Sequence, residues 1–132
     1  MVTLNAAFGW IWITLVMASG ALIGLRFYRE DWLGGYDSWR RRLVRLGHIS
    51  FFGLGILNVL FAMTAPHVSL GASARVIASW AFVIGGVTMP LVCGLAAWRQ
   101  SLRSLFVIPV ASLLTAAITI TLGTLKAGGR VS

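Results

Sequence analysis

The stretch VIASWAFVIGGVTMPLVCGLAAW, residues 76 to 98, decides the fold of this chain. It carries no charged residue, and Arg75 and Arg99 stand directly at its two ends. About 20 helical residues cross a hydrocarbon layer of roughly 30 Å, so this stretch predicts one transmembrane helix. A membrane barrel is not indicated, because its strands alternate apolar and polar residues over about 10 positions.

Similar uncharged stretches lie on both sides of this one. The chain has 132 residues, of which 58% are hydrophobic and 11% charged, whereas soluble domains are about one quarter charged. Pro66, followed by HVSLGAS, predicts a loop after the second stretch. The sequence therefore predicts an all-α membrane protein formed by a single domain, residues 1–132. Its four transmembrane helices are expected at about residues 3–25, 46–65, 76–98 and 104–125.

The basic residues are distributed unevenly between the two ends of these helices. Eight lie in the first and third loops: Arg26, Arg29, Arg40, Arg41, Arg42, Arg45, Arg99 and Arg103. Three lie on the opposite side: Arg75, Lys126 and Arg130. Because cytoplasmic loops carry the excess of Lys and Arg, we expect both termini outside the cytoplasm, with an extended basic cytoplasmic loop between helices 1 and 2. A bacterial inner membrane is the expected location.

The first loop, RFYREDWLGGYDSWRRRLVR, contains all three acidic residues of the chain. Asp37 or Ser38 is expected to cap a helix that begins before the second span. The net charge of +8 predicts contact with anionic lipids rather than nucleic acid, since the cations are juxtamembrane. Ordering of the loop by its own ion pairs, or a purely topological role, are the alternatives. The expected lipid or partner contacts are Arg40, Arg41, Arg42, Arg45, Trp32, Tyr36 and Trp39.

Small and hydroxylated residues recur at helical spacing within the spans. Glycines four residues apart let two helices approach closely, and hydroxyl or amide side chains can bond between helices. Asn58 is expected to bond Thr14, Thr88 or Thr115. The predicted helix-packing residues are Gly20, Gly24, Asn58, Gly86, Gly94, Ser112, Thr115 and Thr119, with Ala116 and Gly123 beside the last three.

His48 is the one side chain in the spans for which the sequence suggests ligand chemistry. Its imidazole can bind a haem iron or a quinone, or bond a neighbouring helix. His67 follows 19 residues later, roughly 28 Å along a helix, so the two histidines cannot share one iron. A haem or quinone would therefore be shared between His48 and a partner subunit. No cofactor is required by the sequence, and Cys93 is expected to be a packing residue.

The spans contain no Asp, Glu, Lys or Arg, although proton-coupled transport usually depends on such residues. We therefore expect no catalytic residues, no metal site and no enzyme. The favoured function is an accessory or scaffold subunit of a larger membrane complex, of the bioenergetic electron-transfer class, with other integral membrane subunits as partners. One alternative is a small channel or transporter for a neutral or anionic solute, which would use the hydroxyls of the fourth span. Another is a haem- or quinone-contacting subunit that uses His48.

Overall fold

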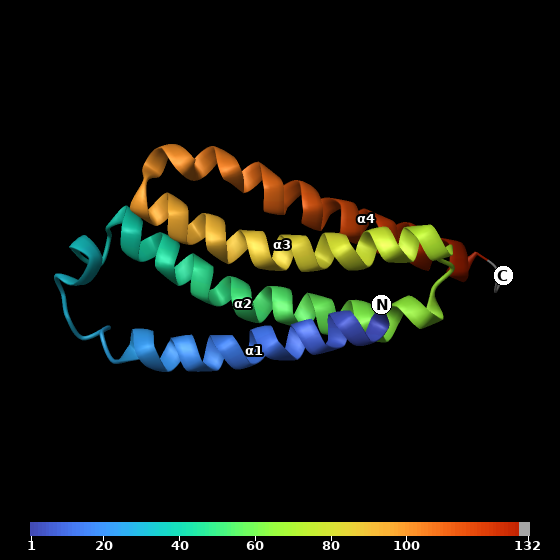
Figure 1. Ribbon diagram of the computed structural model, residues 1–132, viewed down its shortest axis with the longest axis horizontal. Helices are drawn as coiled ribbons and strands as arrows, with labels where there is room; N and C mark the ends of the chain where they lie inside the picture. Colours follow the sequence, from blue (N-terminus) through green and yellow to red (C-terminus); the bar gives the residue numbers. More distant parts are fainter. Residues whose placement is uncertain (130–132) are drawn as a thin grey trace.

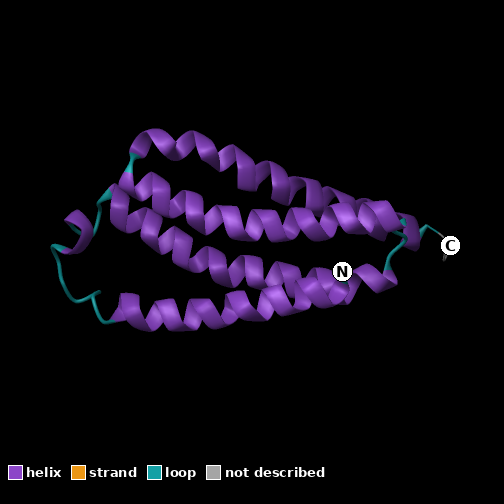
Figure 2. Cartoon of the chain, in the orientation of Figure 1, coloured by secondary structure: helices purple, strands orange, loops and turns teal. Residues whose placement is uncertain are grey.

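A computed structural model of the chain describes residues 1–129, which form four long helices and no strand (Figures 1 and 2). Short 3-10 helices occupy Trp32–Gly34, Ala65–His67 and Gln100–Phe106. Arg130, one of the basic residues behind the expected orientation, lies outside the described residues. The long helices are α1 (Val2–Gly24), α2 (Trp39–Thr64), α3 (Ala72–Trp98) and α4 (Val107–Gly128).

The helices form a row in which each packs mainly against its neighbours in sequence. α2 and α3 form the middle of the row and are more buried than α1 and α4. Each helix is long and apolar enough to cross a membrane, which confirms the predicted all-α architecture with four candidate spans. We call the end that carries residues 25–38 and 99–106 the loop end, and the opposite end the termini end (Figure 1).

The predicted helix boundaries need small corrections at their starts. α2 begins at Trp39, seven residues before the expected span, because Ser38 caps it as predicted. The Ser38 Oγ atom accepts a hydrogen bond of 3.2 Å from the backbone N–H of Arg41, which satisfies one first-turn donor. α3 likewise begins earlier, at Ala72, and α4 later, at Val107, after the 3-10 helix.

Glycine allows the closest approach of α1 and α2. A Cβ atom added at Gly9 would lie 2.6 Å from the carbonyl oxygen of Gly55, and one added at Gly55 would lie 2.9 Å from the carbonyl oxygen of Gly9. Both distances are shorter than any tolerable carbon–oxygen contact, so only glycine fits at either position. The two backbones therefore touch directly in the half of the molecule near the termini end.

Of the four glycines predicted to pack helices together, two do so. Gly86 leaves space for the ring of Phe8, and Gly20 faces the ring of His48. Gly24 and Gly94 are exposed, and no atom lies within 4 Å of an added Cβ, so neither packs closely against another helix within residues 1–129, and packing against a partner subunit stays a prediction. Spacing alone shows that residues share a face, but it does not show that a helix covers that face.

Pro90 interrupts the hydrogen bonding of α3, and α1 compensates for it. Proline has no N–H, so the carbonyl of Gly86, four residues earlier, lacks its usual helical donor. The indole Nε1–H of Trp12 donates a bond of 3.0 Å to this carbonyl. A carbonyl exposed by proline is thus satisfied by a neighbouring helix, as membrane-spanning segments require.

A buried polar cluster joins three helices near the termini end. Asn5 donates to the Oδ1 atom of Asn58 (2.8 Å) and to the carbonyl of Ser79 (3.1 Å), and it accepts from the Ser79 hydroxyl (2.5 Å). The amide of Asn58 donates to the carbonyls of Leu54 and Phe82. Every amide hydrogen in the cluster is used, and the three polar side chains are 0% exposed. These hydrogen bonds hold α1, α2 and α3 together at this end of the molecule.

The partners expected for Asn58 were therefore wrong. Each hydroxyl of Thr14, Thr88 and Thr115 donates to the carbonyl four residues earlier in its own helix. Asn5 was not considered as a partner from the sequence, because it lies at the start of the first span. Since α1 and α2 are antiparallel, however, the start of α1 lies beside the last part of α2, where Asn58 is.

The hydroxyl stripe predicted to pack α4 is only partly correct. Ala116 and Gly123 are buried, and Ser112 and Thr119 are half-buried, but Thr115 is exposed. The contact to α3 is instead made by Leu113, whose side chain fills the space beside Gly85. The apolar side chains between the threonines, rather than the hydroxyls, hold α4 in place.

Candidate functional site

The loop end is organised around one buried cation. Arg41 is 1% exposed, and its guanidinium donates to three backbone carbonyls of the first loop. Its Nη2 atom lies 3.1 Å from the carbonyl of Phe27, and Nη1 lies 3.4 and 3.5 Å from those of Arg29 and Glu30. The loop therefore wraps around Arg41 with its carbonyl oxygens pointing inward.

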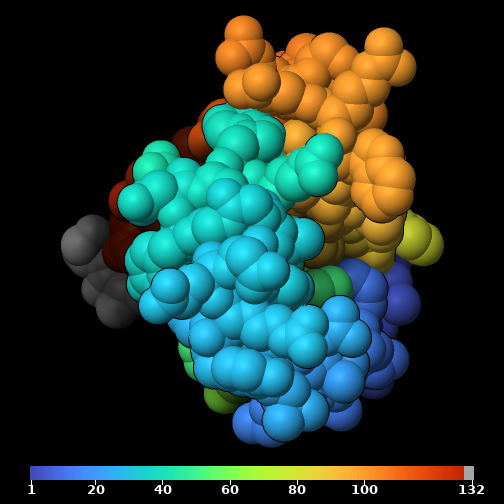
Figure 3. All heavy atoms as spheres, turned by 90° about the vertical axis from the view of Figure 1, so that its left-hand side faces the viewer, coloured from blue at the N-terminus to red at the C-terminus, as the bar shows by residue number. Residues whose placement is uncertain are grey.

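Three aromatic rings complete this enclosure. The guanidinium carbon of Arg41 lies 4.7 Å from the ring centroid of Phe27, 4.9 Å from that of Tyr36 and 5.5 Å from that of Trp32. Cation–π attraction acts within about 6 Å and strengthens when the cation is desolvated. We call Arg41 with these rings the arginine cage. Figure 3 shows the loop, in light blue and cyan, covering this end of α1 and α2.

The arginine cage changes the interpretation of the first loop. Arg41 is buried, so its prediction as a lipid or partner contact was wrong, whereas Arg40, Arg42 and Arg45 are exposed. Ion pairs contribute little to the order of the loop. Among residues 1–129 the only salt bridge joins Arg42 to Asp37 at 3.8 Å, with both side chains mostly exposed, and such pairs are weak.

The predicted aromatic contacts are also used within the chain. Trp32 and Tyr36 line the cage, and Trp39 donates from its Nε1 atom to the carbonyl of Ala96 at 2.9 Å. This last bond fixes the start of α2 on the end of α3. Docking of the exposed ring faces on another subunit stays a prediction.

His48 follows Arg41 by seven residues, about two helical turns, on the same face of α2. Its Nδ1 atom is 3.0 Å from the Oγ atom of Ser19 on α1. Its other ring nitrogen, Nε2, has no hydrogen-bond partner among residues 1–129. The ring is half-buried and faces Gly20, where an added Cβ would lie 3.1 Å from Cε1 and 3.5 Å from Nε2. α1 thus positions the imidazole through one polar contact and one residue without a side chain.

The bonds of Ser19 indicate which ring nitrogen carries the hydrogen. The Ser19 hydroxyl has a single hydrogen, and its Oγ atom lies 2.7 Å from the carbonyl of Leu15, which can only accept. If that hydrogen goes to Leu15, Oγ must accept from the Nδ1–H of His48. The Nε2 atom then keeps its lone pair. Histidines that bind metals are commonly oriented in this way, by donating their other N–H to a neighbouring acceptor.

Two cavities meet at His48. The first, which we call the α1–α2 groove, has a volume of about 650 Å³ and opens where the two helices diverge toward the loop end (Figure 1). Its lining combines two glycines, aliphatic side chains, one aromatic ring and the side chains of two arginines. The lining residues are Gly20, Ile23, Gly24, Phe27, Arg42, Arg45, Leu46, His48 and Ile49.

The second cavity, of about 380 Å³, lies on the other side of the imidazole between α1, α2 and α3. Trp12 and Phe51 line it together with Pro90 and Leu91 of α3, and it is almost entirely apolar. His48 and Ile23 belong to both cavities and separate them. Both volumes fall within the range of roughly 300–1,000 Å³ typical of small-molecule sites.

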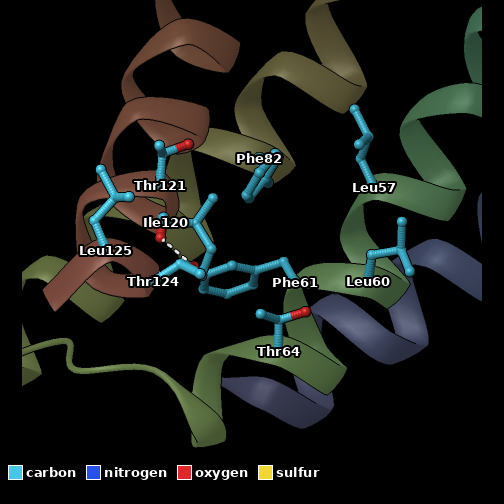
Figure 4. Close-up of a pocket in the computed structure, with 9 residues that line it drawn as sticks. All are labelled: Leu57, Leu60, Phe61, Thr64, Phe82, Ile120, Thr121, Thr124 and Leu125. Carbon is cyan, nitrogen blue, oxygen red and sulfur yellow. Dashed lines mark hydrogen bonds between the residues drawn. The ribbon is translucent and has the colours of Figure 1, made fainter. Parts of the chain in front are cut away.

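A third cavity, near the termini end, offers no comparable chemistry. It has a volume of about 350 Å³ between α2, α3 and α4, and Figure 4 shows its aliphatic and aromatic lining. Its Thr124 hydroxyl is already bonded to the carbonyl of Ile120 at 2.9 Å. No titratable side chain lines it. We therefore place the candidate site at His48.

No protein-family model, curated protein or solved structure matches the chain. Within residues 1–129, no three His, Cys, Asp or Glu side chains lie close enough to hold a metal ion together. Cys93 is fully buried, and its Cβ atom packs beside Gly47, consistent with the predicted packing role. The polar groups that the groove can offer to a ligand are thus the imidazole of His48 and the side chains of Arg42 and Arg45, which lie nearer the loop end.

Proposed function

We propose that this chain is a non-catalytic membrane subunit that binds a ligand through the Nε2 atom of His48, within a larger assembly of the electron-transfer class. The observation that carries the proposal is an imidazole nitrogen without a hydrogen-bond partner among residues 1–129, on a histidine that lines a groove between two candidate membrane spans. The imidazole is half-buried and lines the groove, so a ligand in the groove can reach it. Such a ligand would give Nε2 the partner that residues 1–129 do not supply.

The lone pair assigned to Nε2 limits the ligand class. A lone pair can accept the hydroxyl hydrogen of a quinol or bind the iron of a haem. It cannot donate to the carbonyl oxygen of an oxidised quinone. His67 lies in the 3-10 helix at the opposite end of α2, so a second histidine ligand to the same iron would have to come from another chain. This requirement supports a role as one subunit among several.

The geometry favours this proposal over a channel lined by the hydroxyls of α4. Thr115, Thr119, Thr121 and Thr124 each donate to a carbonyl of their own helix. Those hydrogens are therefore unavailable to a passing anion. α4 is also at the end of the row and contacts mainly α3, so its outer hydroxyls do not line an enclosed path.

We propose that the loop end lies in the cytoplasm of a bacterial cell and that the termini end faces the outside of the inner membrane. The eight basic residues of the first and third loops support this orientation. Single cysteines introduced at position 2 and in the first loop, in a Cys93→Ser background, would be labelled in intact cells with a membrane-impermeant maleimide. Labelling confined to position 2 is expected, and labelling confined to the loop would reverse the orientation.

The function itself is tested by purification in a mild detergent. We expect the wild-type chain to retain a pigment or a quinol, detected by absorption and by mass spectrometry of an organic extract, together with partner subunits. His48→Ala should lose the small molecule and keep the partners, and His67→Ala should keep both. Equal ligand content in all three proteins, or a chain purified alone without ligand, would contradict the proposal.

A further inference from the structure

We infer that the ligand of the α1–α2 groove is a haem, with its iron bound by Nε2 of His48 and its two propionates paired with Arg45 and Arg42. This inference rests on the proposed function, because it names the ligand class for the same site. Three observations carry it: the imidazole nitrogen without a partner among residues 1–129, two arginines without a strong anionic partner there, and two glycines one turn apart on the α1 side of the groove.

The spacing of the three α2 residues suits this ligand. Arg45 and Arg42 precede His48 by three and six residues, which places them about 4.5 and 9 Å nearer the loop end along the helix axis. At 100° per residue, the three positions span about one third of the helix circumference. All three line the same groove. A ligand bound at His48 thus has both arginines in the direction of the loop end.

The two guanidinium groups have no strong anionic partner among the residues that the structure describes. Arg45 lies 5.4 Å from the ring centroid of Tyr36 and 5.9 Å from that of Phe27, and makes no ion pair within residues 1–129. The 3.8 Å pair between Arg42 and Asp37 is exposed to solvent and easily exchanged. Arginine matches a carboxylate in charge and shape and can bind it through two parallel bonds. A ligand with two carboxylates therefore matches the two arginines.

Two glycines lie on the α1 side of the groove, opposite these residues. Gly20 and Gly24 lie one turn apart on α1, and nothing within 4 Å would obstruct a Cβ at Gly24. A side chain at Gly20 would press against the imidazole and obstruct Nε2. The remaining surface is supplied by Ile23, Leu46 and Ile49. The groove therefore offers apolar contacts to a planar ring, and two arginines lie at its end nearer the first loop.

Other ligands satisfy only part of this arrangement. A quinol can use the Nε2 lone pair but has no anionic groups for the arginines. An anionic phospholipid can pair its phosphate with an arginine and donate a headgroup hydroxyl to Nε2, but it brings one anionic group for two arginines. Haem combines an iron that accepts a lone pair with two carboxylates at one edge of a flat apolar ring. Of these three ligand classes, haem alone binds Nε2 and offers a separate carboxylate to each of Arg42 and Arg45.

The test is a titration of the purified full-length chain, in detergent, with ferric iron protoporphyrin IX. We expect binding that shifts the haem absorption band to that of a histidine-ligated haem. His48→Ala should abolish this shift, and free imidazole should restore it by occupying the vacated space. His67→Ala is the matched control and should bind as the wild type does. Because imidazole also ligates haem free in detergent, restoration is measured as haem that co-elutes with the His48→Ala chain, and this co-elution also shows that the chain is folded.

The arginines are tested with a second ligand, the dimethyl ester of iron protoporphyrin IX, which lacks the propionate charges. Arg42→Gln with Arg45→Gln should weaken haem binding at least about tenfold, whereas Arg40→Gln, on the same helix but outside the groove, should leave it unchanged. The ester should bind the wild type as weakly as haem binds the double variant. The double variant should not weaken ester binding further, because one interaction cannot be lost twice.

Each remaining outcome decides between the alternatives. Equal binding of haem and its ester by the wild type would overturn the pairing with Arg42 and Arg45. Haem binding that survives His48→Ala, or that phosphatidylglycerol displaces from a site independent of His48, would overturn the haem assignment. If haem fails to bind but a quinol is retained only when His48 is present, this inference falls and the proposed function stands. If no ligand depends on His48, both fall.

Discussion

The two ends of the α1–α2 interface are built from similar residues but differ in how far their polar groups are satisfied. At the termini end, Asn5 and Asn58 are buried with Ser79, and each amide hydrogen has an acceptor. Toward the loop end, His48 has one bonded nitrogen and one free nitrogen, beside a groove of about 650 Å³. The amides of Asn5 and Asn58 have no donor left to bind a ligand, whereas His48 has one ring nitrogen that can. We therefore interpret the asparagine cluster as structural and the surroundings of His48 as a binding site.

The largest effect is expected from removing the closed cluster. Asn58→Leu deletes the bonds to Asn5 and Phe82 and leaves a buried amide donor of Asn5 unsatisfied, so the free energy of unfolding should fall by about 2–3 kcal/mol. His48→Leu, its counterpart in the open half, should cost about 1 kcal/mol or less. Unfolding by a denaturing detergent measures both. Equal losses would remove the distinction between the two ends.

Glycine substitutions sharpen the same contrast. Gly9→Ala places a methyl group against two backbone atoms of α2, the carbonyl oxygen of Gly55 and the amide nitrogen of Val59. Backbone atoms within a helix cannot rotate away as a side chain can, so the substitution should lower the free energy of unfolding by about 2 kcal/mol. Gly24→Ala, in the open half, meets nothing within 4 Å and should be neutral or slightly stabilising. Thermal unfolding in detergent compares the two variants. A neutral Gly9→Ala would show that the helices separate there without cost.

A smaller loss of about 1 kcal/mol is expected for Trp12→Phe, since the indole N–H no longer satisfies the Gly86 carbonyl that Pro90 leaves free. Trp10→Phe is the matched control, because Trp10 lies on the outer face and is 62% exposed. The same unfolding experiment applies. Similar values for the two variants would mean that the carbonyl of Gly86 finds another donor.

The smallest effect on global stability should come from the arginine cage, because it orders only the first loop. Arg41→Leu should raise hydrogen exchange and protease cleavage within residues 26–37 while leaving the helices intact. Arg42→Leu, which alters an exposed neighbour, should not. Continued protection of the loop in Arg41→Leu would show that the aromatic rings alone hold it.

Much of the fold could be predicted from the sequence because it depends on local properties. Uncharged stretches determine the spans, and Ser38 has the chemistry of a helix cap. Contacts between helices depend on their relative register, which a single chain does not reveal. Gly24 and Gly94 have the spacing of packing residues but face open space, whereas Gly9 was missed and directly contacts the backbone of Gly55.

The site was predictable in part for the same reason. His48 was identified from its residue type, but its partner Ser19 lies on another helix. Among four similar arginines, Arg41 is buried because the first loop encloses it with three carbonyl oxygens and three aromatic rings. The path of that loop is not a local property of the sequence.

The most direct test of the central claim is the tautomer of His48. Nitrogen-15 NMR of the histidine-labelled chain in micelles distinguishes a ring nitrogen that carries hydrogen from one that keeps its lone pair, and His67→Gln assigns the two histidines. We predict hydrogen on Nδ1 and a lone pair on Nε2 for His48 at a pH where the ring is neutral, with the preference lost in Ser19→Ala. Hydrogen on Nε2 in the wild type would contradict an imidazole set to bind iron or accept a hydroxyl hydrogen.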